Sequence, residues 1–330
     1  MAVSHLPLTE RVLPAGNWRW LAIAGWSGLP FVRIAVFALL GAAAGLAPDA
    51  GSLVTGHVVG GLLNASVIAL VLVGTGIVAR QLDRLRTIGG EDTERLVRLN
   101  GSITLPLVIA LLLVLLNTAS HVQEFGLQAM VAAPLVFVID FVLTLLFRIP
   151  QATAFYSSVI AVLTVAALGR HKLPGKFPED RSLGLGSVGE LLTTILVFYA
   201  AVFIPVLVFG TSGNVSEPRV TEFLLTLAMF GLGLAAILLA VWRTHRQMAA
   251  ERSRQVEAAR ARYAAAYRRA VTDSDPAAGW ALQKQRLLLD GAESIHQWPF
   301  DDRTQRILAV VLTGVVTGIV LRLAALLLGV

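Results

Sequence analysis

The amino-acid sequence predicts an all-α, polytopic helical membrane protein, with seven transmembrane helices, one re-entrant or interfacial helix and a cytoplasmic helical hairpin. The 330-residue chain is 56% hydrophobic and 15% charged, with a mean hydropathy of +0.73, whereas a soluble domain carries about 25% charged residues. Apolar segments long enough to cross a bilayer recur along the chain. Basic residues gather in a few of the connections between those segments. Together these features exclude a soluble enzyme, a disordered chain and a nucleic-acid-binding domain.

The membrane spans follow from length, because about 20 apolar residues are needed to cross about 30 Å of hydrocarbon. Seven segments meet this requirement: 29–46, 58–79, 103–119, 128–147, 188–209, 221–242 and 304–330. An eighth apolar segment, 150–169, is more polar at its start. The predicted organisation is therefore a cytoplasmic or interfacial N-terminus (1–28), a membrane bundle (29–242), a cytoplasmic hairpin (243–303) and a last transmembrane helix (304–330).

The positions of the basic residues predict the orientation. All but two of the 27 basic residues, Arg219 and Arg322, fall in four regions that a seven-span chain places on one side. Since positive charge favours the cytoplasm, we expect a cytoplasmic N-terminus and a periplasmic or extracellular C-terminus. The arrangement requires that 150–169 does not cross, so we predict a re-entrant, interfacial or bundle-enclosed helix there. The alternative is eight crossings with a violated charge rule.

The basic residues are nearly all arginine, with lysine only at positions 172, 176 and 284. This bias is typical of a GC-rich bacterium, and it predicts a location in the bacterial inner membrane.

The segment 243–303 predicts two helices. Ala, Arg, Gln and Glu dominate its first part, which favours a helix, and Asp275 with Pro276 can start a second one. Apolar residues recur at helical spacing on both: Met248, Val256, Ala259, Tyr263, Ala266, Tyr267 and Ala270, then Trp280, Leu287, Leu288 and Ile295. An antiparallel hairpin would bury both stripes. The alternative is that the stripes mediate a homo-oligomer or bind a cytoplasmic protein.

Asp140 is the strongest candidate for a functional residue, because it lies inside a predicted span. Counting back from Arg148 as the boundary places it about 12 Å above the cytoplasmic surface, where a charge costs about 2.5–3.5 kcal/mol. Asp140 is either a coupling or pore-lining acid or a structural partner of Arg33, which we predict at a similar depth. Three prolines, at positions 106, 134 and 205, are expected to kink spans near the same route.

The segment before the last span supplies candidate interface anchors. Trp298 and Phe300 suit the headgroup region, and Asp301 can cap the following helix. This Trp-Pro-Phe-Asp segment resembles one in uncharacterised bacterial polytopic membrane proteins. The resemblance covers only 295–303 and implies no activity.

The motifs of common enzymes are missing from the sequence. It contains no His-Glu-x-x-His, no P-loop and no cysteine, so we predict no enzymatic activity, no cofactor and no metal site. The first functional hypothesis is passage of ions or small solutes, as a channel or transporter, with Asp140 and Arg33 near the route. The second is a membrane assembly or signalling component that acts through 243–303. The expected partners are the lipid bilayer, a second copy or a cytoplasmic protein, and no nucleic acid.

Overall fold

The computed structural model describes residues 6–43, 58–86, 88, 90–170, 181–209, 220–272, 276–299 and 302–328. Within these ranges the secondary structure is helical, with no strand. The helices are α1 (Leu8–Val12), α2 (Trp18–Ala43), α4 (Val58–Arg86), α5 (Glu91–Leu99), α6 (Thr104–Ala132), α7 (Pro134–Leu168), α8 (Gly186–Phe209), α9 (Val220–Thr272), α10 (Pro276–Glu293) and α11 (Asp302–Leu328).

Several of these helices have the length and composition of membrane spans. In the described chain, five are long and apolar enough: Gly60–Arg86, Pro134–Leu168, Gly186–Phe203, Leu227–Thr272 and Thr304–Leu321. A sixth results if the bent pair Glu91–Leu99 and Thr104–Ala119, which meet at 48°, is taken as one span. These helices fit the predicted class, a helical protein embedded in a membrane.

The outward face of α6 also fits a lipid environment. Seven consecutive exposed positions along it are leucine or valine: Leu105, Leu107, Val108, Leu111, Leu112, Leu115 and Leu116. A continuous apolar surface of this kind is rare on a soluble monomer and common where acyl chains cover it.

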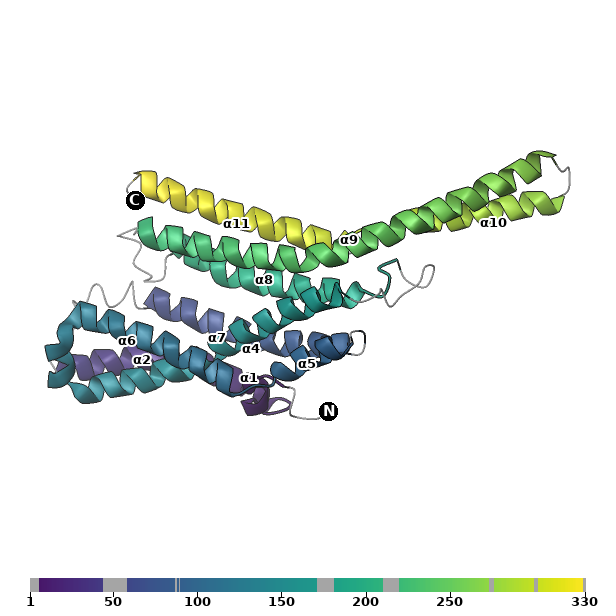
Figure 1. Cartoon of the computed structure of the whole chain (residues 1–330). Helices are drawn as coiled ribbons and strands as arrows, with labels where there is room; N and C mark the ends of the chain where they lie inside the picture. Colours follow the sequence, from purple (N-terminus) through teal and green to yellow (C-terminus); the bar gives the residue numbers. More distant parts are fainter. Residues whose placement is uncertain are drawn as a thin grey trace.

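The long helices form two groups joined by α4 (Figure 1). One group contains α2, α6 and α7, and the other contains α8, α9 and α11. Helix α4 packs on α2 and α7 in the first group and on α8 in the second. The hairpin of α9 and α10 projects from one end of the bundle, while the α6–α7 turn and the C-terminus lie at the other end.

Helices α6 and α7 differ from the prediction. The sequence suggested a span ending at 119, a connection over 120–127 and a new span over 128–147. The structure instead continues α6 to Ala132 and starts α7 at Pro134. The break falls at Ala133 because proline has no N–H to donate and is favoured at the first position of a helix. Pro106 likewise lies in the first turn of α6, so neither of these two prolines kinks a helix interior.

The segment 150–169 is not a separate wedge, since it forms the second half of the 35-residue helix α7. This half packs against α4, α5 and α9, and its side chains Tyr156, Ile160 and Val165 belong to the largest buried cluster of the described chain. One side of the segment is therefore packed against protein, while Phe155, Val159 and Leu163 on the other side are exposed. Hydropathy alone does not distinguish apolar residues that contact protein from those that contact lipid.

The N-terminal segment folds back on the bundle, and α2 starts at Trp18 rather than at 29. Helix α1 packs on α4 and α7. The carboxylate of Glu10, whose side chain is 8% exposed, accepts hydrogen bonds from Nη1 and Nη2 of Arg19 at 2.9 and 2.6 Å. Gly76 on α4 makes room for this pair, since a Cβ there would lie 2.7 Å from both Arg19 Nη2 and Glu10 Oε1. The pair therefore fixes α1 and α2 against α4.

The fully buried residues of the α9–α10 hairpin lie in the half nearest the bundle. Val256, Ala259 and Ala292 are buried between the two helices, with Leu289 packed against them. Farther out, in what we call the open half, large apolar side chains are more than half exposed: Tyr267, Val271, Trp280 and Leu287. The other members of the predicted stripes in this half are partly buried: Tyr263, Ala266, Ala270 and Leu288.

Candidate functional site

Helix α7 carries a series of mostly buried residues, with charged groups at one end. We call this series, every fourth residue from Asp140 to Leu168, the α7 ridge, and it winds gradually around the helix: Asp140, Thr144, Arg148, Ala152, Tyr156, Ile160, Thr164 and Leu168. Residues four apart lie one above the other on a helix. All but the partly exposed Arg148 are buried. The three members nearest the α6–α7 turn are an acid, a hydroxyl and a base.

Asp140 is paired with Arg33 of α2. Arg33 Nε donates to Asp140 Oδ1 at 2.6 Å, and Arg33 Nη2 donates to Oδ2 at 3.3 Å. The Asp140 side chain is 7% exposed and that of Arg33 is 25% exposed. Two parallel N–H donors on one carboxylate form the strong, directional arrangement that guanidinium groups favour. The structure thus brings together the two candidate residues in the geometry of the structural-partner interpretation.

Arg148 adds a second guanidinium group beside this pair. The Cζ atoms of Arg33 and Arg148 lie 5.8 and 5.1 Å from the centroid of the Phe147 ring, within the range of a cation–π contact. Arg148 Nη1 donates to Gln151 Oε1 at 2.6 Å. Its Nε is buried and has no hydrogen-bond acceptor. The guanidinium groups of Arg33 and Arg148 therefore both lie near the buried Phe147 ring. The Asp140 carboxylate lies closer to the α6–α7 turn along α7.

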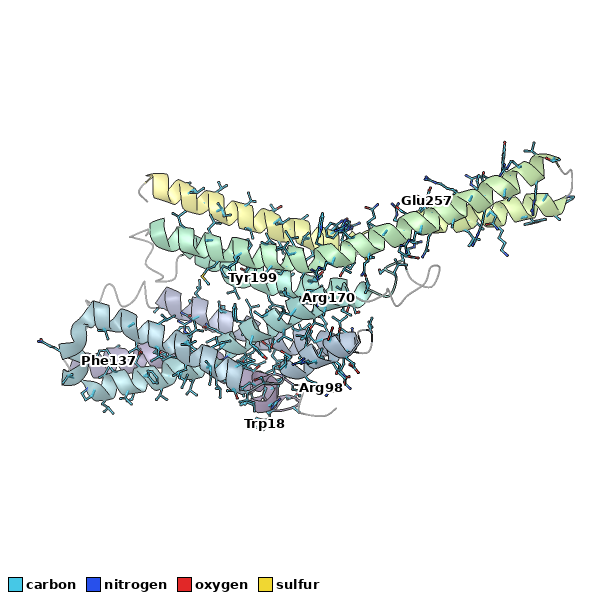
Figure 2. The ribbon with its side chains drawn as sticks, viewed as in Figure 1. Trp18, Arg98, Phe137, Arg170, Tyr199 and Glu257 are labelled. Atoms are coloured by element: carbon cyan, nitrogen blue, oxygen red, sulfur yellow. The ribbon has the colours of Figure 1, made fainter. Side chains whose placement is uncertain are left out.

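The sequence did not identify Arg148 as part of a site, because it was treated as a membrane boundary. Helix α7 continues for about 30 Å beyond it, at 1.5 Å per residue. The boundary used to place Asp140 thus lies inside α7: Asp140 is about 9 Å along the helix from Pro134 and about 42 Å from Leu168. In Figure 2 the neighbouring Phe137 lies near the α6–α7 turn and Arg170 near the base of the hairpin. The spacing of Asp140, Thr144 and Arg148 is the signal that could have revealed the polar end of the ridge.

Trp26 of α2 explains how Pro150 is tolerated inside α7. Proline lacks an N–H, so the carbonyl of Leu146, four residues earlier, loses its helical donor. Trp26 Nε1 donates to that carbonyl at 2.7 Å. This bond joins α2 to α7 and supplies the donor that Pro150 cannot.

Of the predicted interface anchors, the structure describes Trp298. The Trp298 ring stacks on His245 of α9, with centroids 3.8 Å apart and 15° between the planes. His245 Nδ1 lies 2.8 Å from the carbonyl oxygen of Gln297. Trp298 thus holds the connection between α10 and α11 against α9. Phe300 and Asp301 lie outside the described residues.

Neither the search for metal ligands nor the comparison with known proteins identifies a function for this site. Within the described residues, no group of three or more His, Asp or Glu side chains is placed to hold a metal ion. Comparison of the chain with protein-family models, with curated proteins and with solved structures finds no match.

Proposed function

We propose that the protein mediates passage of ions or small solutes across the bacterial inner membrane, as a channel or transporter. The observation that carries the proposal is the polar end of the α7 ridge, where Arg33, Asp140 and Arg148 gather among apolar helices. Charged side chains inside the hydrocarbon region of a membrane cost about 2.5–3.5 kcal/mol each and commonly mark ion or proton pathways. The Arg33–Asp140 pair accounts for two of the three charges, so structural pairing alone leaves the third unexplained.

The proposed topology has seven crossings, by α2, α4, α6, α7, α8, α9 and α11. It places the N-terminus and the hairpin in the cytoplasm and the C-terminus outside. In support, the hairpin and the C-terminus lie at opposite ends of the bundle (Figure 1), and the Arg-rich connections belong to the hairpin end. The excess of basic residues there agrees with the rule that positive loops stay inside.

Labelling of single cysteines tests this topology, since the chain contains no cysteine of its own. Gly175→Cys and Asn214→Cys should react with a membrane-impermeant maleimide from opposite sides of sealed vesicles. Reaction of both from the same side would overturn the seven-crossing arrangement.

Flux measurements in reconstituted vesicles test the transport proposal. The wild-type protein should move at least one ion from a broad panel faster than empty vesicles do. Asp140→Asn should change that rate roughly tenfold or more, because a hydrogen bond to a charged group contributes about 1.5–3 kcal/mol. Glu257→Gln, on the exposed hairpin (Figure 2), is the matched control and should leave the rate unchanged. If the wild-type protein moves nothing across the panel, the transport proposal is wrong.

The open half of the hairpin favours a second function, as an assembly or signalling component. Trp280 and Leu287 lie seven residues apart on α10, hence on one face, and are 73% and 68% exposed. Exposed apolar side chains of this kind on a projecting helical hairpin are typical of a protein–protein interface. Cross-linking of full-length Leu287→Cys in membranes tests contact with a second copy. Arg262→Cys, elsewhere on the rod, controls for random collision.

A further inference from the structure

We propose that Thr144 and Arg148 of α7 form a binding site for a small monovalent inorganic anion, next to the Arg33–Asp140 pair. The inference rests on the proposed function, because it names the class of ion that the ridge would accept. It is carried by two observations: the charge balance at the ridge, and two buried donors without acceptors, the Thr144 hydroxyl and the Arg148 Nε–H.

The charge balance favours an anion. Both carboxylate oxygens of Asp140 accept hydrogen bonds from Arg33, so these two groups neutralise each other. Arg148 forms no ion pair with any described residue, and its one side-chain acceptor is the neutral amide of Gln151. The cluster thus has one net positive charge in a setting where an unpaired charge is costly. A single bound negative charge would compensate it.

The Thr144 hydroxyl is free to donate to a ligand. Many helical threonines in this structure donate to the carbonyl four residues earlier, as Thr75, Thr118, Thr153, Thr164, Thr193, Thr194, Thr272 and Thr313 do, whereas Thr9, Thr93 and Thr244 are buried without a hydrogen bond. Thr144 makes no such bond, although it is completely buried. A buried hydroxyl without a partner is costly unless something occupies it. Its position one turn before Arg148 places both groups on the same face of α7.

The donor set indicates the kind of anion. The Thr144 hydroxyl can donate or accept, whereas the Nε–H and the other N–H groups of Arg148 only donate, so donors predominate in this set. One uncompensated positive charge matches a monovalent ion such as chloride or nitrate better than a divalent phosphate. Arg148 is only partly exposed, and its neighbours Thr144 and Ala152 on the ridge are fully buried. The guanidinium therefore faces protein more than bulk solvent.

Thermal unfolding of the purified full chain tests binding directly. The melting temperature is measured in gluconate buffer with increasing chloride or nitrate at constant ionic strength. A ligand that binds only the folded state raises it in a saturable way. We expect such a rise for wild type and an apparent affinity roughly tenfold weaker or worse in Arg148→Gln and Thr144→Val, since charge-assisted and buried donors are lost. Thr144→Ser keeps the hydroxyl and should retain the response.

Matched variants keep the test decisive if Arg148→Gln does not fold. Arg148→Lys preserves the charge and should retain part of the response, and Thr144→Val changes one hydroxyl to a methyl group. Arg84→Gln, which removes an exposed guanidinium on α4, should respond like wild type. An absent or non-saturable response to both anions, or equal affinity in wild type and Thr144→Val, would overturn the site.

Flux and lipid composition separate this inference from the proposed function. If vesicles conduct an ion but the melting temperature shows no saturable response to chloride or nitrate, the anion site is overturned while passage stands. If no ion moves but the anion-dependent melting shift is lost in Thr144→Val, passage fails while the site stands. A lipid phosphate could supply similar chemistry, so melting is also measured in phosphatidylcholine nanodiscs with and without phosphatidylglycerol. Stabilisation by phosphatidylglycerol alone, with no response to chloride or nitrate, would overturn a free-anion site.

Discussion

Replacing Trp26 by phenylalanine tests how α7 stays continuous through Pro150. The change preserves an aromatic ring on α2 and removes only the indole N–H that donates to the Leu146 carbonyl at 2.7 Å. The lost bond leaves that carbonyl without a donor, because Pro150 cannot supply the helical N–H. The expected result is a lower free energy of unfolding.

The magnitude follows from the setting of the bond. A neutral hydrogen bond contributes about 0.5–1.5 kcal/mol net, and a buried unsatisfied group costs about 1–3 kcal/mol. Bonds between membrane helices average about 0.6 kcal/mol, with a maximum near 1.7 kcal/mol. Because Trp26 is only half-buried, we expect Trp26→Phe to cost about 1 kcal/mol.

A double-mutant cycle with Pro150→Ala isolates the effect. Alanine at this position restores the backbone N–H, so the Leu146 carbonyl regains its own donor and no longer needs the indole. Trp26→Phe should then cost clearly less in the Pro150→Ala background, and the difference measures the coupling. The free energy of unfolding is obtained from denaturation in mild detergent. Trp20→Phe, a largely exposed tryptophan on the same helix, is the control. Equal costs of Trp26→Phe in both backgrounds would refute the reasoning.

Three further predictions concern packing at other points of the bundle. Gly233→Ala should destabilise the packing of α9 against α8, because its Cβ would lie 2.1 Å from the Tyr199 hydroxyl. The Cβ of Gly231→Ala would meet nothing within 4 Å, so this variant should leave the free energy of unfolding unchanged or raise it by up to about 1 kcal/mol. Thermal unfolding of the two variants compares them. Glu10→Gln should cost about 1–3 kcal/mol by leaving a partly buried guanidinium unpaired, and it should expose the N-terminus to limited proteolysis; wild-type protease resistance would contradict this. Trp298→Leu should speed amide hydrogen exchange in 294–299, because the stack of the indole on the His245 imidazole is lost. Unchanged exchange would show that this stack does not hold the segment against α9.

The sequence predicted the class of fold because hydropathy and length depend on local composition. The helical character, the apolar spans beginning near 58, 188 and 304, and the pairing of Arg33 with Asp140 as one of two alternatives all follow from residue type and spacing. These features need no knowledge of which helices touch.

The extent of α7 could not be predicted, because it depends on contacts between distant residues. Pro150 lies inside α7, and the indole that satisfies the freed carbonyl lies 120 positions away in the sequence. Arg148 suggested a membrane boundary, because an arginine that packs on Phe147 inside the bundle has the same sequence signature as one facing water. The apolar composition of 150–169 likewise gives no sign of whether lipid or protein covers it.

The unbroken course of α9 has a mechanical consequence. A single helix of 53 residues connects the packed bundle to the open half of the hairpin, with no loop between them to absorb movement. The part beyond Trp242 extends about 45 Å at 1.5 Å per residue, so a tilt of about 10° at the bundle displaces the far tip by about 8 Å. A small rearrangement of the membrane helices would therefore produce a large displacement of the hairpin tip near Trp280.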